Sequence, residues 1–226
     1  MRTIVLATSN PHKVEEIGAI FRGIAAPFRL IGLMEAADWC NAASGFPEPP
    51  EIGATFEANA RIKACAYATH TKLPCLADDS GLEIDALGGR PGVISSHFSS
   101  DGLETGLTRL ERDRLNIERV LRELGETPDA ERSARFVCVM CLALPPRDER
   151  AHPRIVAESR GTFEGRIGRI GHVPRGTNGF GYDPIFLVSP GFDRTSAELT
   201  RDEKNRLSHR GSAARNLVAA LPATDW

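Results

Sequence analysis

The stretch Leu76-Ala77-Asp78-Asp79-Ser80-Gly81 sets the fold that we expect, because it places two adjacent carboxylates at the end of an apolar strand, directly before a turn. Successive side chains of a strand point to opposite faces, so one carboxylate can face a cleft while the other anchors the loop. Ligands of open α/β sheets bind at the carboxyl ends of the strands. The pair therefore predicts a ligand site at the edge of an α/β sheet.

Strand-like and helix-like segments alternate along the rest of the chain, which favours an α/β fold. The expected strands cover residues 4–7, 28–31, 73–78, 82–87, 134–144, 154–163 and 185–188. The expected helices cover residues 11–21, 56–69 and 115–124, with a short one after the capping box Thr200-x-x-Glu203 and a last one after Ser208. Residues 36–53 are expected to form a loop and 88–92 a turn. The length favours one domain over residues 1–226, built as two lobes.

The charges of the chain are nearly balanced, with 28 Lys and Arg against 30 Asp and Glu and a formal net charge of -2. Such a chain has no overall basic field for a nucleic acid polymer, so a cationic site has to be local. The N-terminal strand is too short for a secretion signal, and the longest apolar run, residues 136–144, is too short to span a bilayer. We therefore expect a cytoplasmic protein without a membrane partner.

The five cysteines do not indicate a disulfide framework, because their number is odd and the chain has no export signal. Cys138-Val139-Met140-Cys141 matches the C-x-x-C pattern of zinc and thiol redox sites. In an apolar strand, however, residues three apart point to opposite faces, and no second C-x-x-C completes a zinc site. Core packing of free thiols is therefore the better interpretation.

The segment Thr8-Ser9-Asn10-Pro11-His12-Lys13 joins the first strand to the first helix and is typical of a phosphate-binding loop. Backbone N–H groups and the dipole at a helix N-terminus favour anions. Ser9, Asn10 and Lys13 add hydrogen-bond donors and a positive charge. The alternative is an ordinary capped helix with a solvated lysine, because the segment is no Walker motif.

The aspartate pair is a candidate for holding Mg²⁺, which takes one or two carboxylates together with the phosphates of its substrate. Glu51 offers a further carboxylate just before the helix in which Asn59 and Lys63 share one face. The alternative is a hydrophilic Asp-Asp-Ser-Gly turn.

A glycine-rich aromatic turn lies late in the chain, at Thr177-Asn178-Gly179-Phe180-Gly181-Tyr182-Asp183-Pro184. The glycines on either side of Phe180 permit a positive φ and a close approach of the backbone to a ligand. An exposed ring at Phe180 can stack on a base, a contact worth about 1–3 kcal/mol in nucleic-acid complexes. The alternative is a tight turn whose rings lie in the core.

Lys204 and the segment Ser208-His209-Arg210-Gly211 add cationic groups near the last helix, where His209 and Arg210 are expected to face solvent. Taken alone, they indicate only a solvated cationic face. Together with the acid pair, the phosphate loop and the stacking platform, they favour an enzyme that hydrolyses nucleotides.

These segments resemble the motifs of the inosine triphosphate pyrophosphatase family, enzymes that hydrolyse noncanonical purine nucleoside triphosphates. The motifs that carry the resemblance are Ala7-Thr8-Ser9-Asn10-x-x-Lys13, Gly53-x-Thr55-Phe56-x-x-Asn59-Ala60-x-x-Lys63-Ala64, Ala77-Asp78-Asp79-Ser80-Gly81-Leu82, Leu87-Gly88-Gly89-x-Pro91-Gly92, Gly179-Phe180-Gly181-Tyr182-Asp183-Pro184, Glu198-Leu199-Thr200-x-x-Glu203-Lys204 and Ser208-His209-Arg210-Gly211. They run nearly end to end and in order, which makes the resemblance specific. It implies an elongated mixed β-sheet flanked by helices, two lobes with a central cleft, and a homodimer.

The resemblance also implies a role for each matching position. Asp79 is the general base that activates a water molecule, and Asp79 and Glu51 hold Mg²⁺. The loop and the lysines bind the triphosphate, while the aromatic turn forms the base pocket with His209 and Arg210. The implied substrate-binding residues are Thr8, Ser9, Asn10, Pro11, His12, Lys13, Lys63, Ser80, Phe180, Gly181, Tyr182, Asp183, Lys204, His209 and Arg210.

The chain departs from the family pattern at a few positions, which bear on fine positioning and not on the reaction class. Ile52 stands where the family usually has Thr, Ala58 where many members have Glu, and His97 where an Arg is common. Pro11-His12 replaces the more usual small residues.

On this resemblance, water attacks the α-phosphorus of ITP, dITP or XTP, and pyrophosphate leaves. Arg210 or His209 can donate a hydrogen bond to a 6-oxo group, whereas the 6-amino group of adenine leaves that donor unpaired. One alternative is a Maf-like pyrophosphatase with a different base preference, against which the late aromatic and Ser-His-Arg motifs argue. The other is a non-catalytic nucleotide sensor, which would not need Asp79 and Glu51.

Overall fold

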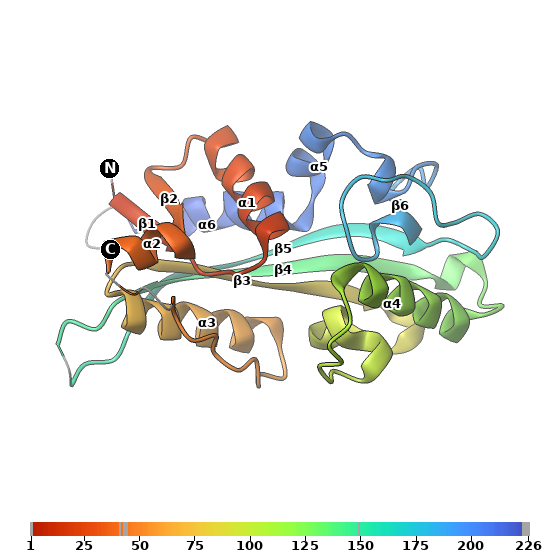
Figure 1. Cartoon of the computed structure of the whole chain (residues 1–226). Coiled ribbons are helices and arrows are strands. Elements are labelled where there is room, and N and C mark those ends of the chain that lie inside the picture. The colour runs from red at the N-terminus through yellow and green to blue at the C-terminus, as the bar shows by residue number, and fades with distance from the viewer. Residues whose placement is uncertain (1, 41, 43–44, 149, 223–226) are drawn as a thin grey trace. The chain divides into compact units, whose positions relative to one another are not determined.

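The computed structural model describes residues 2–40, 42, 45–148 and 150–222, and within these ranges six strands form a mixed sheet flanked by helices (Figure 1). The strand order is β2-β1-β3-β4-β5-β6. The predicted α/β fold with a mixed sheet is thereby confirmed. The chain divides into two compact units, Met1–Asp79 with Cys138–Gly161 and His209–Trp226, and Ser80–Val137 with Thr162–Ser208. The single domain of two lobes with a central cleft stays a prediction.

The helices and strands are distributed over both units. The first unit holds β1 (Arg2–Leu6), α1 (Pro11–Gly23), β2 (Phe28–Gly32), α2 (Leu33–Trp39), α3 (Phe56–Thr71) and α6 (His209–Ala220). The second unit holds a 3₁₀ segment (Gly92–Ser100), α4 (Arg109–Leu124), β6 (Phe186–Val188) and α5 (Arg201–Leu207). Three long strands contribute residues to both units: β3 (Cys75–Ile84), β4 (Ser133–Leu144) and β5 (Arg154–Ile167).

In the first unit, β1 lies between β2 and β3 and pairs with both in parallel, with Val5 opposite Cys75. Figure 1 shows α1 and α6 on one side of these strands and α3 on the other. The apolar faces of α1 and α6 pack against the strands and form one hydrophobic core with them. Members of this core include Ile4, Leu6, Ile17, Ile20, Phe21, Leu76, Met140 and Leu217.

Local sequence signals start the first helices. Asn10 caps α1, since its side chain accepts hydrogen bonds from the backbone N–H groups of His12 and Lys13, and Pro11 is the first residue of the helix. Thr55 caps α3 in the same way. Each cap satisfies N–H groups that have no partner inside the helix, and both predicted starts are confirmed.

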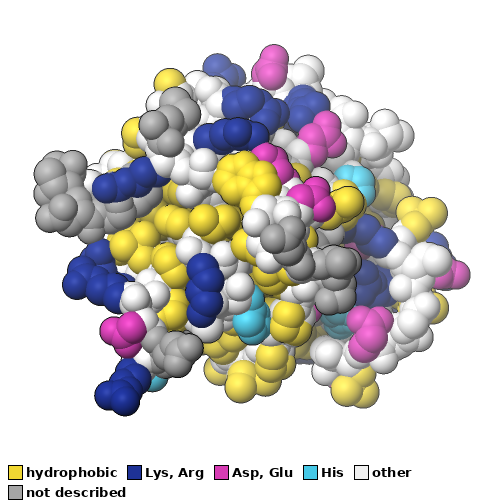
Figure 2. All heavy atoms as spheres, turned by 60° about the vertical axis from the view of Figure 1, so that its left-hand side comes forward, with side chains coloured by type: hydrophobic (Ala, Val, Ile, Leu, Met, Phe, Trp, Pro, Cys, Tyr) yellow, Lys and Arg dark blue, Asp and Glu magenta, His cyan; other side chains and the backbone are white. Residues whose placement is uncertain are grey.

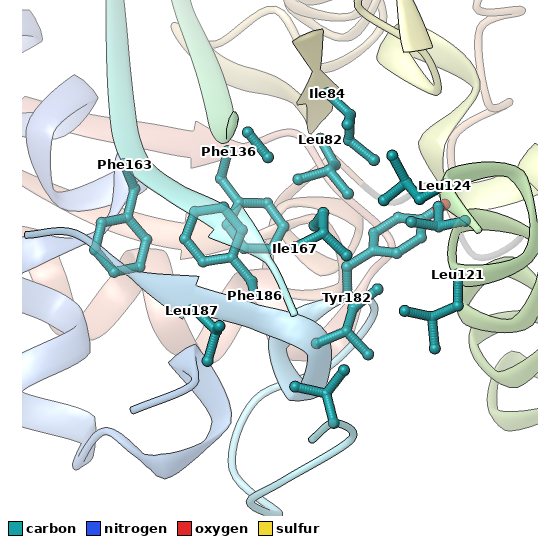
Figure 3. Close-up of a cluster of buried hydrophobic side chains, with 14 of the residues drawn as sticks. Leu82, Ile84, Leu121, Leu124, Phe136, Phe163, Ile167, Tyr182, Phe186 and Leu187 are labelled. Atoms are coloured by element: carbon teal, nitrogen blue, oxygen red, sulfur yellow. The ribbon is translucent and has the colours of Figure 1, made fainter. Parts of the chain in front are cut away.

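In the second unit, β6 pairs antiparallel with β5, and the rings of Phe136, Phe163 and Phe186 pack together in the core (Figure 3). The ring centroids of Phe136 and Phe186 are 4.5 Å apart. Figure 3 shows Tyr182 beside Leu124 of α4 in the same cluster. The Tyr182 ring therefore belongs to the core of this unit.

A buried arginine connects two backbone segments of the second unit through three carbonyl groups. Arg132 is 1% exposed, and its guanidinium donates to the carbonyl oxygens of Thr127 at 2.9 Å, Gly168 at 3.2 Å and Gly125 at 2.5 Å. No carboxylate is among these partners. The side chain thus satisfies carbonyl groups that the turn after α4 and the end of β5 leave without a backbone donor.

The predicted end of the strand before Ser80 is wrong. β3 runs without interruption from Cys75 to Ile84, so Asp78 and Asp79 lie inside a strand and not before a turn. β3 has a neighbour on each side, β1 and β4. Pairing inside the sheet outweighs the weak strand preference of aspartate, serine and glycine.

Two helices differ from the sequence-based expectation. α2 covers residues 33–39 and thus part of the predicted loop 36–53, of which residues 41, 43 and 44 lie outside the described ranges. Its N-cap is Gly32, which has no side chain to accept a capping hydrogen bond, so no polar capping residue in the sequence marks the start of this helix. α4 starts at Arg109 and not near Leu115, because Thr108 and Glu111 form a capping box.

All five cysteines lie within the described residues and are free thiols. Cys138 and Cys141 are buried in β4, and burial raises the pKa of both thiols, that of Cys141 to about 12. A thiol in such surroundings is unreactive, which confirms core packing over redox use. None of the helices in the described ranges combines the length and the apolar character that a bilayer crossing requires.

Candidate active site

Asp78 and Asp79 are each held by a different lysine, from helices on opposite sides of the first unit's strands (Figure 1). Asp78 Oδ2 lies 2.7 Å from Lys13 Nζ of α1, and Asp79 Oδ1 lies 2.9 Å from Lys63 Nζ of α3. Both carboxylates are almost excluded from solvent. The prediction that the two side chains diverge is confirmed, although a strand and not a turn holds them.

Asp78 anchors two cationic groups. Besides Lys13, Arg210 Nε lies 4.0 Å from Asp78 Oδ2, and Arg210 Nη1 donates to Glu16 Oε2 at 3.1 Å. Burial alone would raise the pKa of Asp78, but Lys13, Arg210 and Lys63 outweigh it and lower the pKa to about 2. The carboxylate therefore stays ionised at neutral pH and fixes Lys13 and Arg210.

The expectation that His209 and Arg210 face solvent is wrong. Each residue is 4% exposed. The carboxylates of half-buried Glu16 and buried Asp78 compensate the charge of Arg210, which makes burial of a guanidinium at the start of α6 tolerable. Glu16 is a residue that sequence reasoning missed, because its pairing with Arg210 spans most of the chain.

Asp79 and Glu51 converge on one ammonium group. Lys63 Nζ, 2.9 Å from Asp79, also lies 3.1 Å from Glu51 Oε1. Burial raises the pKa of Asp79 to about 6, even though Lys63 opposes the shift. For Lys63, burial alone would lower the pKa, but Asp79, Asp78 and Glu51 together raise it.

The loop before α1 is held largely by its own side chains. Thr8 Oγ1 accepts from the backbone N–H of Asn10 at 3.2 Å, and Ser9 Oγ donates to Glu48 Oε1 at 3.3 Å. His12 is exposed, while Lys13 reaches Asp78. Asn10 thus caps α1, and Lys13 is ion-paired and not solvated, while the binding of an anion by this loop stays a prediction.

The donor set at Glu51 and Asp79 fits a hard divalent cation. Both carboxylates lie within 3.1 Å of the same nitrogen atom, Lys63 Nζ, and the side chain of Glu51 is 42% exposed and therefore accessible. Among the described residues, no group of three or more His, Cys, Asp or Glu is arranged to hold a metal ion. Two carboxylates nevertheless suffice for Mg²⁺ when water and substrate phosphates complete its shell.

In the second unit, Asp183 organises the aromatic turn. Its Oδ2 accepts from the backbone N–H of Phe180 at 2.8 Å and from Lys204 Nζ at 2.5 Å, and its Oδ1 accepts from Ser196 Oγ at 2.7 Å. Asp183 is 3% exposed. The carboxylate thus fixes the turn and the position of Lys204, whose Nζ lies 5.6 Å from the centroid of the half-buried Phe180 ring.

The start of α4 also contacts this turn, which sequence reasoning missed. The guanidinium carbon of Arg109 lies 4.4 Å from the Phe180 ring centroid, in the range of a cation–π contact. Asp113 accepts from the backbone N–H of Gly181 at 3.0 Å. Arg109 and Asp113 are four residues apart on one helix face, so their spacing signals only a helical ion pair.

Two further predicted site residues are Tyr182, which lies in the core of the second unit, and Ser80, which lies within a strand. The Tyr182 hydroxyl donates to the carbonyl oxygen of Ser95 at 2.7 Å, and burial raises its pKa, so the side chain serves the core of the second unit. Ser80 is half-buried in β3. Their roles toward a ligand stay predictions.

Replacing Gly179 with alanine is expected to destabilise the second unit more than replacing Gly181. Both glycines have a positive φ, +79° and +61°, which costs an alanine about 1–2 kcal/mol. At Gly179 a Cβ would in addition overlap the Asp183 carboxylate and the Lys204 ammonium, whereas at Gly181 nothing lies within 4 Å. Urea unfolding of both variants measures the difference, and equal losses would contradict the crowding at Gly179.

Comparisons with known proteins show which proteins this chain is similar to. Residues 4–220 match the sequence model of the Ham1 family. A curated relative from Streptomyces avermitilis, named dITP/XTP pyrophosphatase, is 41% identical over 98% of each chain. A solved HAM1 protein from Coxiella burnetii superposes with a TM-score of 0.74 at 41% identity, covering 97% of this chain and 98% of its own. A nucleoside-triphosphatase, or dITP/XTP pyrophosphatase, from Mycobacterium abscessus has a TM-score of 0.67 at 39% identity, covering 97% and 99%.

Proposed function

The chain belongs to the Ham1 family, and on that premise we propose that it hydrolyses noncanonical purine nucleoside triphosphates to the monophosphate and pyrophosphate, thereby removing ITP, dITP and XTP from the nucleotide pool. The curated relative from Streptomyces avermitilis carries dITP and XTP in its name. The observation that supports the proposal most is the pair of buried carboxylates in β3, each ion-paired with its own lysine. Asp78 thereby holds a lysine for the triphosphate, while Asp79 offers a carboxylate that can serve as a metal ligand and as a base.

We assign Asp79 the role of general base toward the water that attacks the α-phosphorus. Lys63 donates to its Oδ1 and the amide of Asn59 donates to its Oδ2, so the orientation of the carboxylate is fixed. Lys13 and Lys63 neutralise the charge that builds up on the phosphate oxygens, which is where catalysis of phosphoryl transfer mainly lies. The resemblance gives Lys204 the same role, and that assignment stays a prediction.

Glu51 and Asp79 are the residues that would hold Mg²⁺. When bound, the ion polarises phosphate oxygens and offsets their negative charge. Lys63 is ion-paired with both carboxylates in the structure and balances their negative charge. Its ammonium would also be available to the phosphate oxygens of a bound substrate.

We propose that the base is selected by its 6-oxo group. The family resemblance assigns the stacking surface to the Phe180 ring, and it assigns the donor that pairs with the oxygen to His209 or Arg210. Burial of both residues favours discrimination, because a buried donor left without an acceptor costs far more than an exposed one.

We expect a homodimer that works in the cytoplasm, where the nucleotide pool lies. α2 of the first unit exposes Met34 and Trp39, 86% and 51% exposed. Figure 2 brings this side of the molecule forward and shows apolar side chains gathered among lysine and arginine. An exposed apolar surface of this kind favours burial against a second copy.

The proposed function is tested by measuring pyrophosphate release from ITP, XTP, dITP, GTP and ATP with Mg²⁺ and with a chelator. We expect release from ITP, XTP and dITP to be about a hundredfold or more faster than from ATP. The chelator should abolish it, because the proposed chemistry needs the metal. GTP, which is also a 6-oxo purine, reports how the site treats a 2-amino group.

Other outcomes favour the alternatives. Equal turnover of ATP and ITP would refute selection by the 6-oxo group. Preferential hydrolysis of pyrimidine triphosphates would indicate a Maf-like activity. Tight binding of ITP without release of pyrophosphate would leave a nucleotide sensor.

A further inference from the structure

We propose that Asn59 is a positioning residue that fixes the spacing between Glu51 and Asp79, the two carboxylates assigned to the metal ion. The proposal rests on the proposed function, but the effect of Asn59 on metal affinity can be measured without it. Asn59 lies on α3 and is 2% exposed, so its amide has to find partners inside the protein.

Both ends of the amide are used, and they reach two different segments. Asn59 Nδ2 donates to Asp79 Oδ2 at 3.3 Å, and Asn59 Oδ1 accepts from the backbone N–H of Gly53 at 2.7 Å. Only this orientation satisfies both contacts, because an ionised carboxylate cannot donate and a backbone N–H cannot accept. The side chain therefore connects Asp79 to the segment that carries Glu51, two residues before Gly53.

The contact at Gly53 is too close for any other residue. A Cβ at this position would lie 2.6 Å from Asn59 Oδ1 and 2.7 Å from the Cβ of Ala58. The backbone of the segment thus lies directly on the first turn of α3. A glycine here serves close approach, not an unusual φ.

A second connection between Glu51 and Asp79 exists, through Lys63, but it is the weaker positional constraint. The Glu51 side chain is 42% exposed, and a partly exposed ion pair of two flexible side chains fixes geometry poorly. The buried amide of Asn59 instead holds the backbone at Gly53. It therefore restrains the backbone position from which the Glu51 side chain extends. We infer that Lys63 supplies charge and Asn59 supplies position.

The competing explanation is that Asn59 only satisfies buried polar groups, and the chain offers a matched control for it. Asn116 lies on α4 in the second unit, is also 2% exposed, and likewise holds loop backbone with its amide. Its Nδ2 donates to the carbonyl oxygens of Ser95 and Ser96, and its Oδ1 accepts from the N–H of Ser99. Asn116 contacts neither Glu51 nor Asp79.

The test measures the affinity for Mn²⁺ without substrate in the wild type and in three variants, Asn59→Ala, Gly53→Ala and Asn116→Ala. Electron paramagnetic resonance detects the binding. Steady-state hydrolysis of ITP and urea unfolding are measured in parallel. Gly53→Ala disturbs the same connection from its other end, and Gly23→Ala, where a Cβ meets nothing within 4 Å, is its control. Loss of a partner that orients a metal ligand typically weakens metal binding about 10–100-fold.

We expect Asn59→Ala and Gly53→Ala to weaken Mn²⁺ binding by about tenfold or more, and to raise by a similar factor the Mg²⁺ concentration needed for half-maximal activity. Asn116→Ala should lose stability but keep the Mn²⁺ affinity of the wild type. Equal Mn²⁺ affinity in all variants would overturn the proposal, as would equal weakening in Asn59→Ala and Asn116→Ala. A wild type that binds Mn²⁺ but releases no pyrophosphate would refute the proposed function and leave the positioning role to be judged by Mn²⁺ binding alone.

Discussion

Replacing Asp79 with asparagine should lower the rate of pyrophosphate release from ITP by about a hundredfold or more, the contribution typical of a general base. Asparagine has nearly the shape of aspartate, but its amide cannot take a proton from water. Lys63 keeps Glu51 as a partner at 3.1 Å, so the variant should fold. The measurement is kcat with saturating ITP and Mg²⁺, together with urea unfolding.

The control for this variant is Asp85→Asn in the second unit. The side chain of Asp85 is 50% exposed and pairs with Arg135 at 2.9 Å, outside the candidate site. We expect turnover near that of the wild type. Near-normal turnover of Asp79→Asn itself would show that another group activates the water.

Replacing Arg132 with methionine should cost about 3 kcal/mol or more of the free energy of unfolding. The substitution keeps a long side chain in the core, but it removes the donors from three carbonyl groups, those of Gly125, Thr127 and Gly168. A buried polar group that loses its partner costs about 1–3 kcal/mol. Equilibrium unfolding in urea, followed by fluorescence and circular dichroism, measures the loss.

Arg122→Met is the matched control, because Arg122 is exposed on α4 of the same unit. Its replacement should change stability by less than about 0.5 kcal/mol. If Arg132→Met were as stable as Arg122→Met, the three carbonyl groups would have found other donors, and Arg132 would not be the tie that the structure indicates.

Signals that act over a few residues were readable from the sequence. Asn10 with Pro11 and Thr55 mark helix starts, because capping depends on neighbouring groups alone. The prediction that Cys138 and Cys141 belong to the core is confirmed. It needed only two local features, the alternation of side chains along a strand and the apolar run around both cysteines. The divergence of Asp78 and Asp79 follows from the same alternation.

What the sequence could not supply depends on contacts between distant segments. The persistence of β3 through Ser80 and Gly81 comes from neighbouring strands, which override local preference. The burial of Arg210 depends on Glu16, at the other end of the chain. The contact of Arg109 with Phe180 depends on how α4 lies in the second unit, which no motif encodes.

The unbroken course of β3 constrains how this chain can change in length. Downstream of Asp79, Leu82 and Ile84 are fully buried in the core of the second unit, while Glu83 between them is partly exposed. Inserting or deleting one residue at Ser80 or Gly81 would exchange these faces and turn a glutamate into the core. A hairpin turn at this position would absorb such a change, whereas a paired strand transmits it. Natural variation here should therefore consist of substitutions, with insertions and deletions confined to the connections outside the sheet.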